Sequence, residues 1–451
     1  MRTIAFHNLG CKVNSYETDY MVQKCAQNGY KIVDFEQKAD VYIVNTCSVT
    51  NIADRKSRQM LHKAKKTNPE SVVVAVGCFV QANPDEAAKD ESIDLLVGNN
   101  KKREIFEILE KYFEEKDASS NDKELGGETF VDVEKCEYEE MTVTGSAERC
   151  RVFVKIQDGC DRYCTYCIIP YARGAVRSRK SENIIEEIKL IAQNGYREIV
   201  LSGIHISSYG KDFKTGKEPA DHLFELMSEI EKIDGIERIR IGSFEPMILT
   251  EDFVSKLSTI KKLCPHFHIS LQSGCDQVLK RMNRHYDTEK FFEKTVLLRK
   301  YFKHCALTTD VIVGFPGETE EEFEETYEYL KKIRFFETHI FPYSRRKGTI
   351  ADRMDGQLTN SIKKERASKL LELDEKLSKE FRESKIGEKT NVIIEEIKIF
   401  DGKEYFVGHT PEYVFCAMEK TENQADITGE KVNVRITGML NDETVTAEIG
   451  G

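Results

Sequence analysis

Three cysteines lie within one short stretch of the chain, Cys160-Asp-Arg-Tyr-Cys164-Thr-Tyr-Cys167. They directly follow a predicted strand, Arg151–Gln157, in which apolar and polar side chains alternate. Three thiolates in one loop can ligate three irons of a [4Fe–4S] cluster and leave the fourth iron open. The amino and carboxylate groups of S-adenosylmethionine could fill that open position. An electron passed from the cluster into the sulfonium would then break a C–S bond and release a 5′-deoxyadenosyl radical.

Two other interpretations of this loop stay open. The cysteines could hold zinc, which at structural sites has four ligands, and Cys150 could be the fourth. The chain would then be a zinc-bearing RNA-binding protein. A non-catalytic iron–sulfur electron carrier is a third candidate, but such a carrier would not need the large α/β domain predicted around the loop. A visible spectrum separates these classes, because a zinc protein is colourless and an iron–sulfur protein is brown.

A second set of cysteines is spread over the first part of the chain. Cys11, Cys47 and Cys78 each come just after a predicted strand. Because the carboxyl ends of parallel strands meet at one edge of a sheet, where ligands bind, these three thiols could converge on a second cluster. The alternative is three buried cysteines of an ordinary hydrophobic core, which are common.

The chain has 13 cysteines in all, and a cytosolic protein rarely uses them in disulfides. The remaining seven show no ligand spacing, and we expect a structural role for each of them: Cys25, Cys136, Cys150, Cys264, Cys275, Cys305 and Cys416.

Strand and helix patterns divide the chain into four regions. Residues 1–113 alternate between strands and helices, which predicts a Rossmann-like parallel sheet. Residues 114–145 are acidic and read as a linker with one strand near Phe130–Val133. Residues 146–378 contain six strand–helix units, which predicts a partial (β/α)6 barrel, since a complete one has eight. The expected barrel strands are Arg151–Gln157, Glu198–Leu201, Arg238–Ile241, His266–Leu271, Leu307–Val313 and Glu337–Phe341.

Residues 379–451 contain five short predicted strands and no long helix. This pattern predicts a small all-β barrel, a form that often binds oligonucleotides, although a purely structural cap has the same pattern.

Composition limits the classes of partner. The net charge is −11, so a nonspecific nucleic-acid footprint over the whole surface is disfavoured. Three stretches could still supply a local basic face: Arg173/Arg177/Arg179/Lys180, Lys280/Arg281/Arg284 and Arg345/Arg346/Lys347. No apolar run approaches the roughly 20 residues of a membrane span, and Met1–Cys11 does not resemble a signal peptide. We therefore expect a cytoplasmic protein with no membrane partner.

Six motifs in order along the chain resemble the methylthiotransferase family of radical S-adenosylmethionine enzymes. The motifs cover nearly the whole chain: Asn8-Leu-Gly-Cys-Lys-Val-Asn14; Asn45-Thr-Cys47 with Gly77-Cys78; Gln157-Asp-Gly-Cys160 through Cys167-Ile-Ile-Pro-Tyr-Ala-Arg-Gly174; Ser270-Leu-Gln-Ser-Gly274 with Met282-Asn-Arg284; Asp310-Val-Ile-Val-Gly-Phe-Pro-Gly-Glu-Thr319; and Tyr343-Ser-Arg-Arg-Lys-Gly-Thr349. The basic residue added in the last motif has no counterpart in the family's usual pattern.

The resemblance implies two [4Fe–4S] clusters with different tasks. Cys160, Cys164 and Cys167 would hold the cluster that cleaves S-adenosylmethionine. Cys11, Cys47 and Cys78 would hold an auxiliary cluster that carries or delivers sulfur. One S-adenosylmethionine would donate a methyl group, and a second would supply the radical that abstracts hydrogen from C2 of an adenine. The resemblance also implies an electron donor such as flavodoxin or ferredoxin.

Further contacts follow from the same resemblance. Tyr166 stands where the family places an aromatic ring beside the adenine of S-adenosylmethionine, and Gly203 and Gln272 lie at ends of predicted barrel strands that face the same mouth. The C-terminal region resembles the family's RNA-binding TRAM domain. No side chain beyond the cluster ligands is expected to act as a catalytic acid or base.

The family's known branches differ in substrate. They modify N6-threonylcarbamoyladenosine or N6-isopentenyladenosine in tRNA, at position 37 beside the anticodon, or an aspartate of a ribosomal protein. The sequences Leu9-Gly-Cys-Lys-Val-Asn14 and Lys155-Ile-Gln-Asp-Gly-Cys160 most resemble the threonylcarbamoyladenosine branch. That substrate carries a carboxylate, which requires a cationic partner, and the sequence does not single out which cation.

Overall fold

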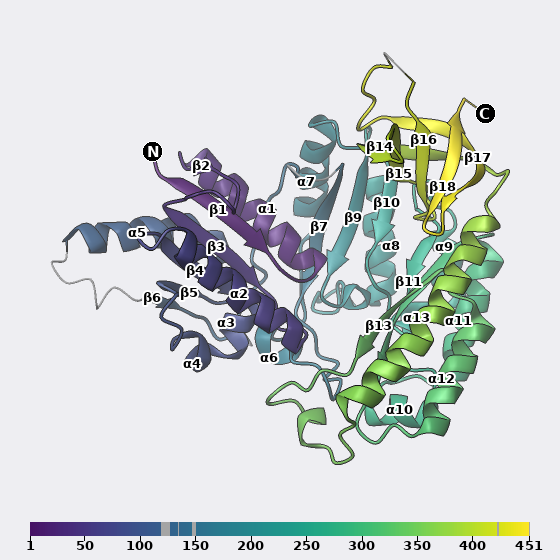
Figure 1. Ribbon diagram of the computed structural model, residues 1–451, viewed down its shortest axis with the longest axis horizontal. Helices are drawn as coiled ribbons and strands as arrows, with labels where there is room; N and C mark the ends of the chain where they lie inside the picture. Colours follow the sequence, from purple (N-terminus) through teal and green to yellow (C-terminus); the bar gives the residue numbers. More distant parts are fainter. Residues whose placement is uncertain (119–126, 134, 147–149, 422–423, 451) are drawn as a thin grey trace.

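The computed structural model describes residues 1–118, 127–133, 135–146, 150–421 and 424–450. The described residues form three parts: an N-terminal sheet covered by helices, a central curved series of strands with outer helices, and a small C-terminal barrel (Figure 1). Within the described ranges, no helix has the length and hydrophobicity needed to cross a lipid bilayer. The α/β architecture predicted from the sequence is confirmed.

The N-terminal part is a six-stranded sheet in which every pairing is parallel. Its strands lie in the order β2 (Lys31–Ile32), β1 (Thr3–Asn8), β3 (Val41–Thr46), β4 (Val72–Gly77), β5 (Leu95–Val97) and β6 (Gly127–Thr129). The chain places β2 on one side of β1 and then places β3, β4 and β5 in succession on the other side. In such sheets the crevice for a ligand lies at the carboxyl ends of the two strands where the order changes side, here β1 and β3.

Helices cover both faces of this sheet. One hydrophobic cluster joins it to α1 (Lys12–Gln27) and α5 (Ile105–Ala118), and a second joins it to α2 (Asn51–Thr67) and α3 (Cys78–Ala82). Every residue of β3 and β4 is therefore buried, which explains why these strands are continuous apolar runs in the sequence.

The predicted linker is less separate from its neighbours than its composition indicates. α5 extends to Ala118, and β6 pairs with β5 as the last strand of the N-terminal sheet. The strand expected near Phe130–Val133 is thus found slightly earlier, at Gly127–Thr129. Met141 and Val143 are buried in the core of the central part. The domain boundaries drawn from the sequence stay a prediction.

The central part contains the six expected parallel strands. They are β7 (Arg151–Asp158), β9 (Glu198–Gly203), β10 (Arg238–Ile241), β11 (His266–His268), β12 (Ala306–Val313) and β13 (Glu337–Pro342). Two sheets, β10-β9-β7 and β11-β12-β13, are joined by the parallel bridges Ile239–Leu263 and Phe244–Ile269. The short antiparallel β8 (Arg177–Ser178) lies beside β7, so the barrel is open at this edge. The partial barrel is confirmed.

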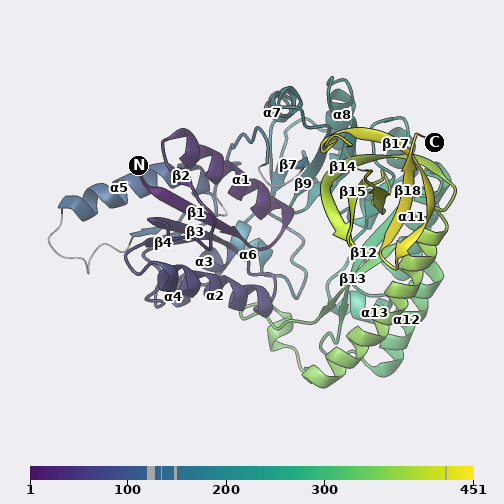
Figure 2. The same cartoon turned by 45° about the horizontal axis from the view of Figure 1, so that its top comes forward.

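The outer helices of the barrel have clear sequence signals for their ends. In α12 (Glu320–Ile333), Thr319 and Glu322 form a reciprocal capping box, and three glutamates occupy the first turn. Figures 1 and 2 show α11 (Thr288–Tyr301), α12 and α13 (Asn360–Glu383) along the side of the barrel remote from the N-terminal sheet.

The C-terminal part is a closed barrel of five strands, in the order β14 (Lys389–Phe400), β15 (Lys403–His409), β16 (Phe415–Glu419), β18 (Thr444–Ile449) and β17 (Lys431–Asn441) (Figure 2). Arg238 and Arg240 of the central part donate to carbonyls of His409 and Thr410 at 2.8 and 2.7 Å. Buried Glu198 holds both guanidiniums, so the small barrel is attached at the amino ends of β9 and β10.

Tyr413 from the small barrel enters the amino-terminal end of the central barrel. Its ring stacks on His266 at 5.0 Å between centroids, and the guanidiniums of Arg151 and Arg240 lie over it at 5.0 and 4.8 Å. The small barrel therefore lines one end of the central barrel, while the other end, at the carboxyl termini of the strands, faces the N-terminal sheet.

Candidate functional site

The first cysteine loop follows β7 at the carboxyl end of the central barrel. Gly159 has φ +72°, and a Cβ there would lie 1.8 Å from the carbonyl oxygen of Ala175, so only glycine permits this turn. The amide of Cys160 donates to the carbonyl of Gly174, and the amide of Thr165 donates to the carbonyl of Met282. The loop is thus held from two sides, and its three thiols form no disulfide.

Burial governs the protonation of these thiols. Burial and the neighbouring thiols raise the pKa of Cys160 to about 11 and that of Cys167 to about 12. The Arg284 guanidinium donates to Sγ of Cys164 at 3.2 Å. Cys160 and Cys167 are thus costly to ionise alone, and a cationic metal bound by this cluster of thiols would stabilise the thiolate form. The residues therefore fit the iron–sulfur cluster predicted for this loop.

The second set of cysteines lies at the carboxyl edge of the N-terminal sheet. Cys11 follows β1, Cys47 follows β3 and Cys78 follows β4, and these three strands are neighbours. Gly10, with φ +112°, passes so close to Cys47 that an added Cβ would lie 2.9 Å from its Sγ. The structure therefore places Cys11, Cys47 and Cys78 together at the edge of the sheet where β1 and β3 end, as the sequence predicts.

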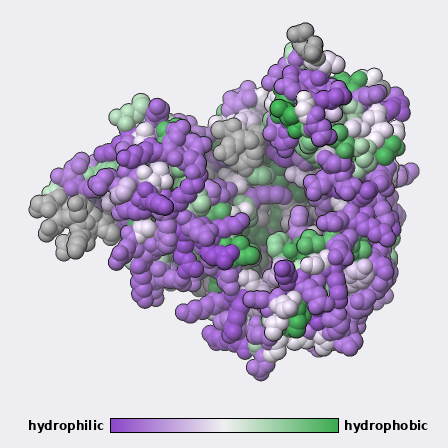
Figure 3. Space-filling model, in the orientation of Figure 1, coloured by the Kyte–Doolittle hydropathy of each residue, from purple (hydrophilic) through white to green (hydrophobic). Residues whose placement is uncertain are grey.

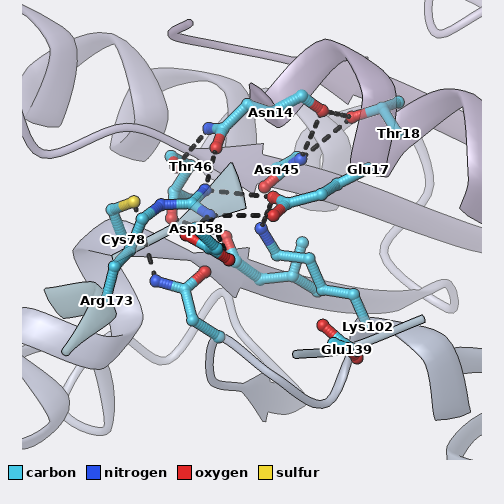
Figure 4. A network of polar contacts seen from close by, with 12 residues as sticks. Asn14, Glu17, Thr18, Asn45, Thr46, Cys78, Lys102, Glu139, Asp158 and Arg173 are labelled. Atoms are coloured by element: carbon cyan, nitrogen blue, oxygen red, sulfur yellow. Dashed lines mark hydrogen bonds and ion pairs between the residues drawn. The ribbon is translucent and has the colours of Figure 1, made fainter. Parts of the chain in front are cut away.

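The charges of these thiols act on one another. Burial, then the charge of Cys78 and that of Cys11, raise the pKa of Cys47 to about 12. Burial also raises the pKa of Cys11, while Arg173 opposes the shift. The Cys78 side chain lies beside the Arg173 guanidinium (Figure 4). Three thiols that repel one another as thiolates, with a cation beside them, again fit a metal cluster.

The surface is hollowed between the N-terminal sheet and the barrel (Figure 3). A cavity of about 360 Å³ is lined by Cys160, Cys164, Cys167 and their surroundings. An adjoining cavity of about 440 Å³ is lined by Cys11. The two share Ser243 and Asp310 as lining residues, so the two cavities are neighbours. Cys47 and Cys78 are buried behind Cys11, at 5% and 3% exposure.

The three other predicted contacts also line these cavities. Tyr166 and Gln272 face the cavity of the first cysteine loop, and the Tyr166 ring packs edge-on against Phe315. Gln272 has φ +71°, a strained backbone for a non-glycine residue. Gly203 lines the second cavity, where a Cβ would lie 2.9 Å from Oε1 of Gln157.

Several cavity residues were given no role in the sequence analysis. Glu245 forms a buried ion pair with Arg284 at 2.8 Å, which fixes the guanidinium that contacts Cys164. His268 and Asp310 lie 3.3 Å apart, and the ring of His339 stacks on His268. Glu245 follows β10 and His268 ends β11, and that position was the signal that could have identified them. Asp310 and His339 lie inside β12 and β13, where no such signal marks them.

Lys12, the first residue of α1, projects into the second cavity. The surrounding protein and the charges of Arg151 and Arg240 lower the pKa of Lys12, and Asp310 opposes that shift. Its side chain nevertheless stays exposed to the cavity.

The prediction that Arg173, Arg177 and Arg179 could form a basic face is wrong. All three are buried, because each pairs with carboxylates or carbonyls brought in from distant segments. Arg346 is likewise buried and binds Asp54 of α2. These arginines join parts of the protein to one another and do not form a surface for nucleic acid.

A network of buried charges connects the two cysteine sites (Figure 4). Glu17 of α1 binds Lys155 at 2.7 Å, Arg173 at 2.8 Å and also Lys102. Arg173 lies 3.1 Å from Asp158, the last residue of β7. The network therefore fixes α1, which begins beside Cys11, against β7, which leads to Cys160.

Comparisons with known proteins agree with this arrangement. Residues 154–330 match the Radical SAM superfamily, and residues 3–98 match a family described as Uncharacterized protein family UPF0004. Among solved structures, the radical S-adenosylmethionine methyltransferase TsrM from Kitasatospora setae superposes with a TM-score of 0.55 at 15% identity, covering 76% of this chain and 73% of that one. This likeness concerns the fold alone.

Curated relatives span nearly the whole chain. The Threonylcarbamoyladenosine tRNA methylthiotransferase MtaB of Bacillus subtilis is 41% identical over 97% of this chain and 94% of the relative. The protein of the same name from Aquifex aeolicus is 42% identical, over 87% and 93%. The tRNA-2-methylthio-N(6)-dimethylallyladenosine synthase of Acetivibrio thermocellus is 34% identical, over 95% and 87%. The chain belongs to the radical S-adenosylmethionine methylthiotransferase family.

Proposed function

We propose that this protein converts N6-threonylcarbamoyladenosine at position 37 of tRNA to its 2-methylthio derivative. The observation that carries the proposal is the pair of three-cysteine sites that border one hollow. One site suits radical formation and the other suits sulfur delivery, so a base placed in the hollow can be reached from both. Two relatives named for threonylcarbamoyladenosine are 41% and 42% identical, whereas relatives named as dimethylallyladenosine synthases are 33% to 36% identical. Two further threonylcarbamoyladenosine relatives, at 35% and 33%, fall in that same range.

Cys160, Cys164 and Cys167 would hold the [4Fe–4S] cluster that, with S-adenosylmethionine, supplies a radical able to remove hydrogen from C2 of the adenine. The protein's own residues position these components. Arg284 orients the Cys164 thiolate through its 3.2 Å contact. Tyr166 and Gln272 line the space beside the loop and are proposed contacts of S-adenosylmethionine, as Gly203 is from the adjoining cavity.

Cys11, Cys47 and Cys78 would hold the second, auxiliary cluster. Of the three, Cys11 is the exposed one and lines the cavity, so sulfur would reach the substrate from its side of the site. Arg173 supplies a fixed positive charge beside Cys78. The buried ion pairs of Glu17 with Lys155 and Arg173 would hold the Cys11 site in a fixed position relative to the Cys160 loop.

The C-terminal barrel is proposed as a TRAM-like module that binds the anticodon arm of tRNA. A closed five-stranded barrel suits this role, and its attachment through Arg238 and Arg240 would hold bound RNA in a fixed position relative to the hollow. An electron donor such as flavodoxin or ferredoxin is required by the reaction. The cytoplasmic location stays a prediction.

The iron–sulfur assignment predicts the colour and metal content of the isolated protein. Purified without oxygen, the chain should be brown, bleach on reduction and contain iron and sulfide in amounts that approach two four-iron clusters. Elemental analysis with a visible spectrum makes the measurement. A colourless protein with stoichiometric zinc would instead establish the zinc-bearing RNA-binding alternative.

The substrate is tested by mass spectrometry of tRNA nucleosides from cells with and without the protein. We expect loss of the methylthio form of threonylcarbamoyladenosine, while the unthiolated nucleoside accumulates. Loss of the methylthio isopentenyl nucleoside instead would keep the reaction and replace the substrate, a second candidate that rests on the 34% identical relative. No change in any tRNA nucleoside would favour a ribosomal-protein aspartate.

A further inference from the structure

The cavity beside Cys11 is lined by charged and hydrogen-bonding side chains as well as by apolar atoms. Its lining residues come from the turn before α1 and from the carboxyl halves of barrel strands: Gly10, Cys11, Lys12, Val13, Ser202, Gly203, Gly242, Ser243, His268, Asp310 and His339. Val13 is the one aliphatic side chain among them. A charged, hydrogen-bonding substituent could pair with these polar side chains, whereas an isopentenyl group would bury them without partners.

Lys12 is distinctive among the cations of the hollow. Arg284 is paired with Glu245, and Arg162 donates to His205 at 3.4 Å. Within the described part of the chain, Lys12 makes no ion pair and no hydrogen bond. The charge of Asp310 acts on Lys12 from a distance, but no anion among the described residues is in direct contact with the ammonium, which is therefore positioned for an anionic ligand.

The N6-threonylcarbamoyl group has the matching chemistry. It carries a carboxylate, a hydroxyl and ureido N–H groups, so it needs a cation and hydrogen-bond acceptors. In adenine, N1 lies between C2 and C6, so the N6 substituent and the carbon that receives sulfur flank the same ring atom. A base presented to Cys11 through C2 therefore brings its N6 substituent close to Lys12, the next residue in the chain.

We propose that Lys12 binds the carboxylate of the N6-threonylcarbamoyl group, with Asp310 accepting a hydrogen bond from its hydroxyl, and that Lys12 thereby selects an anionic substrate. This inference rests on the proposed function and identifies the residue that recognises the N6 substituent of the substrate. Asp310 is already held by His268 at 3.3 Å, so its carboxylate is oriented before the substrate arrives.

The test measures binding to synthetic anticodon stem-loops with three forms of the target adenosine: threonylcarbamoyl, its methyl ester, and unmodified. The protein with both clusters reconstituted should bind the threonylcarbamoyl form about tenfold to a hundredfold more tightly than the ester. Lys12→Gln should bind the two alike, and Lys12→Arg should keep most of the preference. Lys56→Gln, at an exposed position of α2, removes the same charge and should keep it fully.

Two control measurements separate substrate recognition from damage to the neighbouring cluster. Lys12→Gln should retain its iron content and its visible spectrum. Equal affinities of the unsubstituted protein for acid and ester would overturn the inference, as would an undiminished preference in Lys12→Gln. If the unsubstituted protein methylthiolates the isopentenyl nucleoside and not the threonylcarbamoyl one, the proposed substrate fails, and the role of Lys12 fails with it.

Discussion

Cys160→Ala should abolish cleavage of S-adenosylmethionine, whereas Cys47→Ala should preserve cleavage and abolish methylthiolation. The reason is the separation of the two cysteine sets: Cys160 lies in the loop after β7, and Cys47 lies in the other domain, after β3. Removing one of the three thiols of either set leaves too few protein ligands for that cluster. Production of 5′-deoxyadenosine reports the first step, and mass spectrometry of the tRNA nucleoside reports the second.

The matched control is Cys305→Ala, which removes a buried thiol of the barrel core. This variant should keep both activities and the full iron content, although it loses some stability from the cavity left behind. Cys47→Ala should lose about half of the bound iron. If Cys47→Ala retained full methylthiolation, the assignment of the second cluster to the N-terminal sheet would be wrong.

The sequence located these six thiols because each follows a strand that could be recognised. Local patterns suffice for that purpose: β3 and β4 are uniform apolar runs, and β7 precedes the first loop in an alternating pattern. The order of parallel strands then brings their carboxyl ends to one edge, so residues far apart in sequence meet there. Convergence of Cys11, Cys47 and Cys78 was therefore predictable without any long-range contact being known.

The buried arginines could not be predicted in the same way. Arg173 is the only charged residue between Ile168 and Val176, and nothing in that stretch indicates its main partner, Glu17, which is 156 residues away. Nothing local marks Glu17 either, since it occupies an ordinary helical position in α1. Whether a charge is paired and buried depends on how two domains pack, and this information is spread over the whole chain. For the same reason, the sequence alone did not single out Lys12 as the cation for the substrate carboxylate.

Glu17→Gln should be strongly destabilising, by roughly 3–5 kcal/mol, because it leaves buried cations without their counter-charge. Burial alone would raise the pKa of Glu17, but Arg173, Lys102 and Lys155 hold it well below its ordinary value. The carboxylate therefore contributes its full stabilisation above about pH 4.5, and the contribution is lost as the pH falls further toward the lowered pKa. Glutamine has the same shape, so the loss reports charge and not packing.

Thermal unfolding of the substituted and unsubstituted proteins, followed between pH 4 and 8, measures this effect. Glu107→Gln is the matched control, since Glu107 forms an exposed pair with Lys24 at 3.0 Å and should cost at most about 1 kcal/mol. The destabilisation in Glu17→Gln should be largest near neutral pH and diminish on acidification. If Glu17→Gln and Glu107→Gln unfolded at the same temperature at pH 7, water would be solvating the buried cations in place of Glu17. The network would then not hold the domains together.

The same variant tests whether the network couples the two cysteine sites. Glu17 connects α1, which begins beside Cys11, with Lys155 and, through Arg173, with Asp158 at the end of β7. If this connection keeps the sites in register, Glu17→Gln at a temperature where it remains folded should form more 5′-deoxyadenosine for each methylthiolated nucleoside. Glu107→Gln should keep the original ratio. An unchanged ratio in a destabilised Glu17→Gln would limit the network to stability, and alignment of the two sites would then depend on other contacts, such as Arg346 with Asp54.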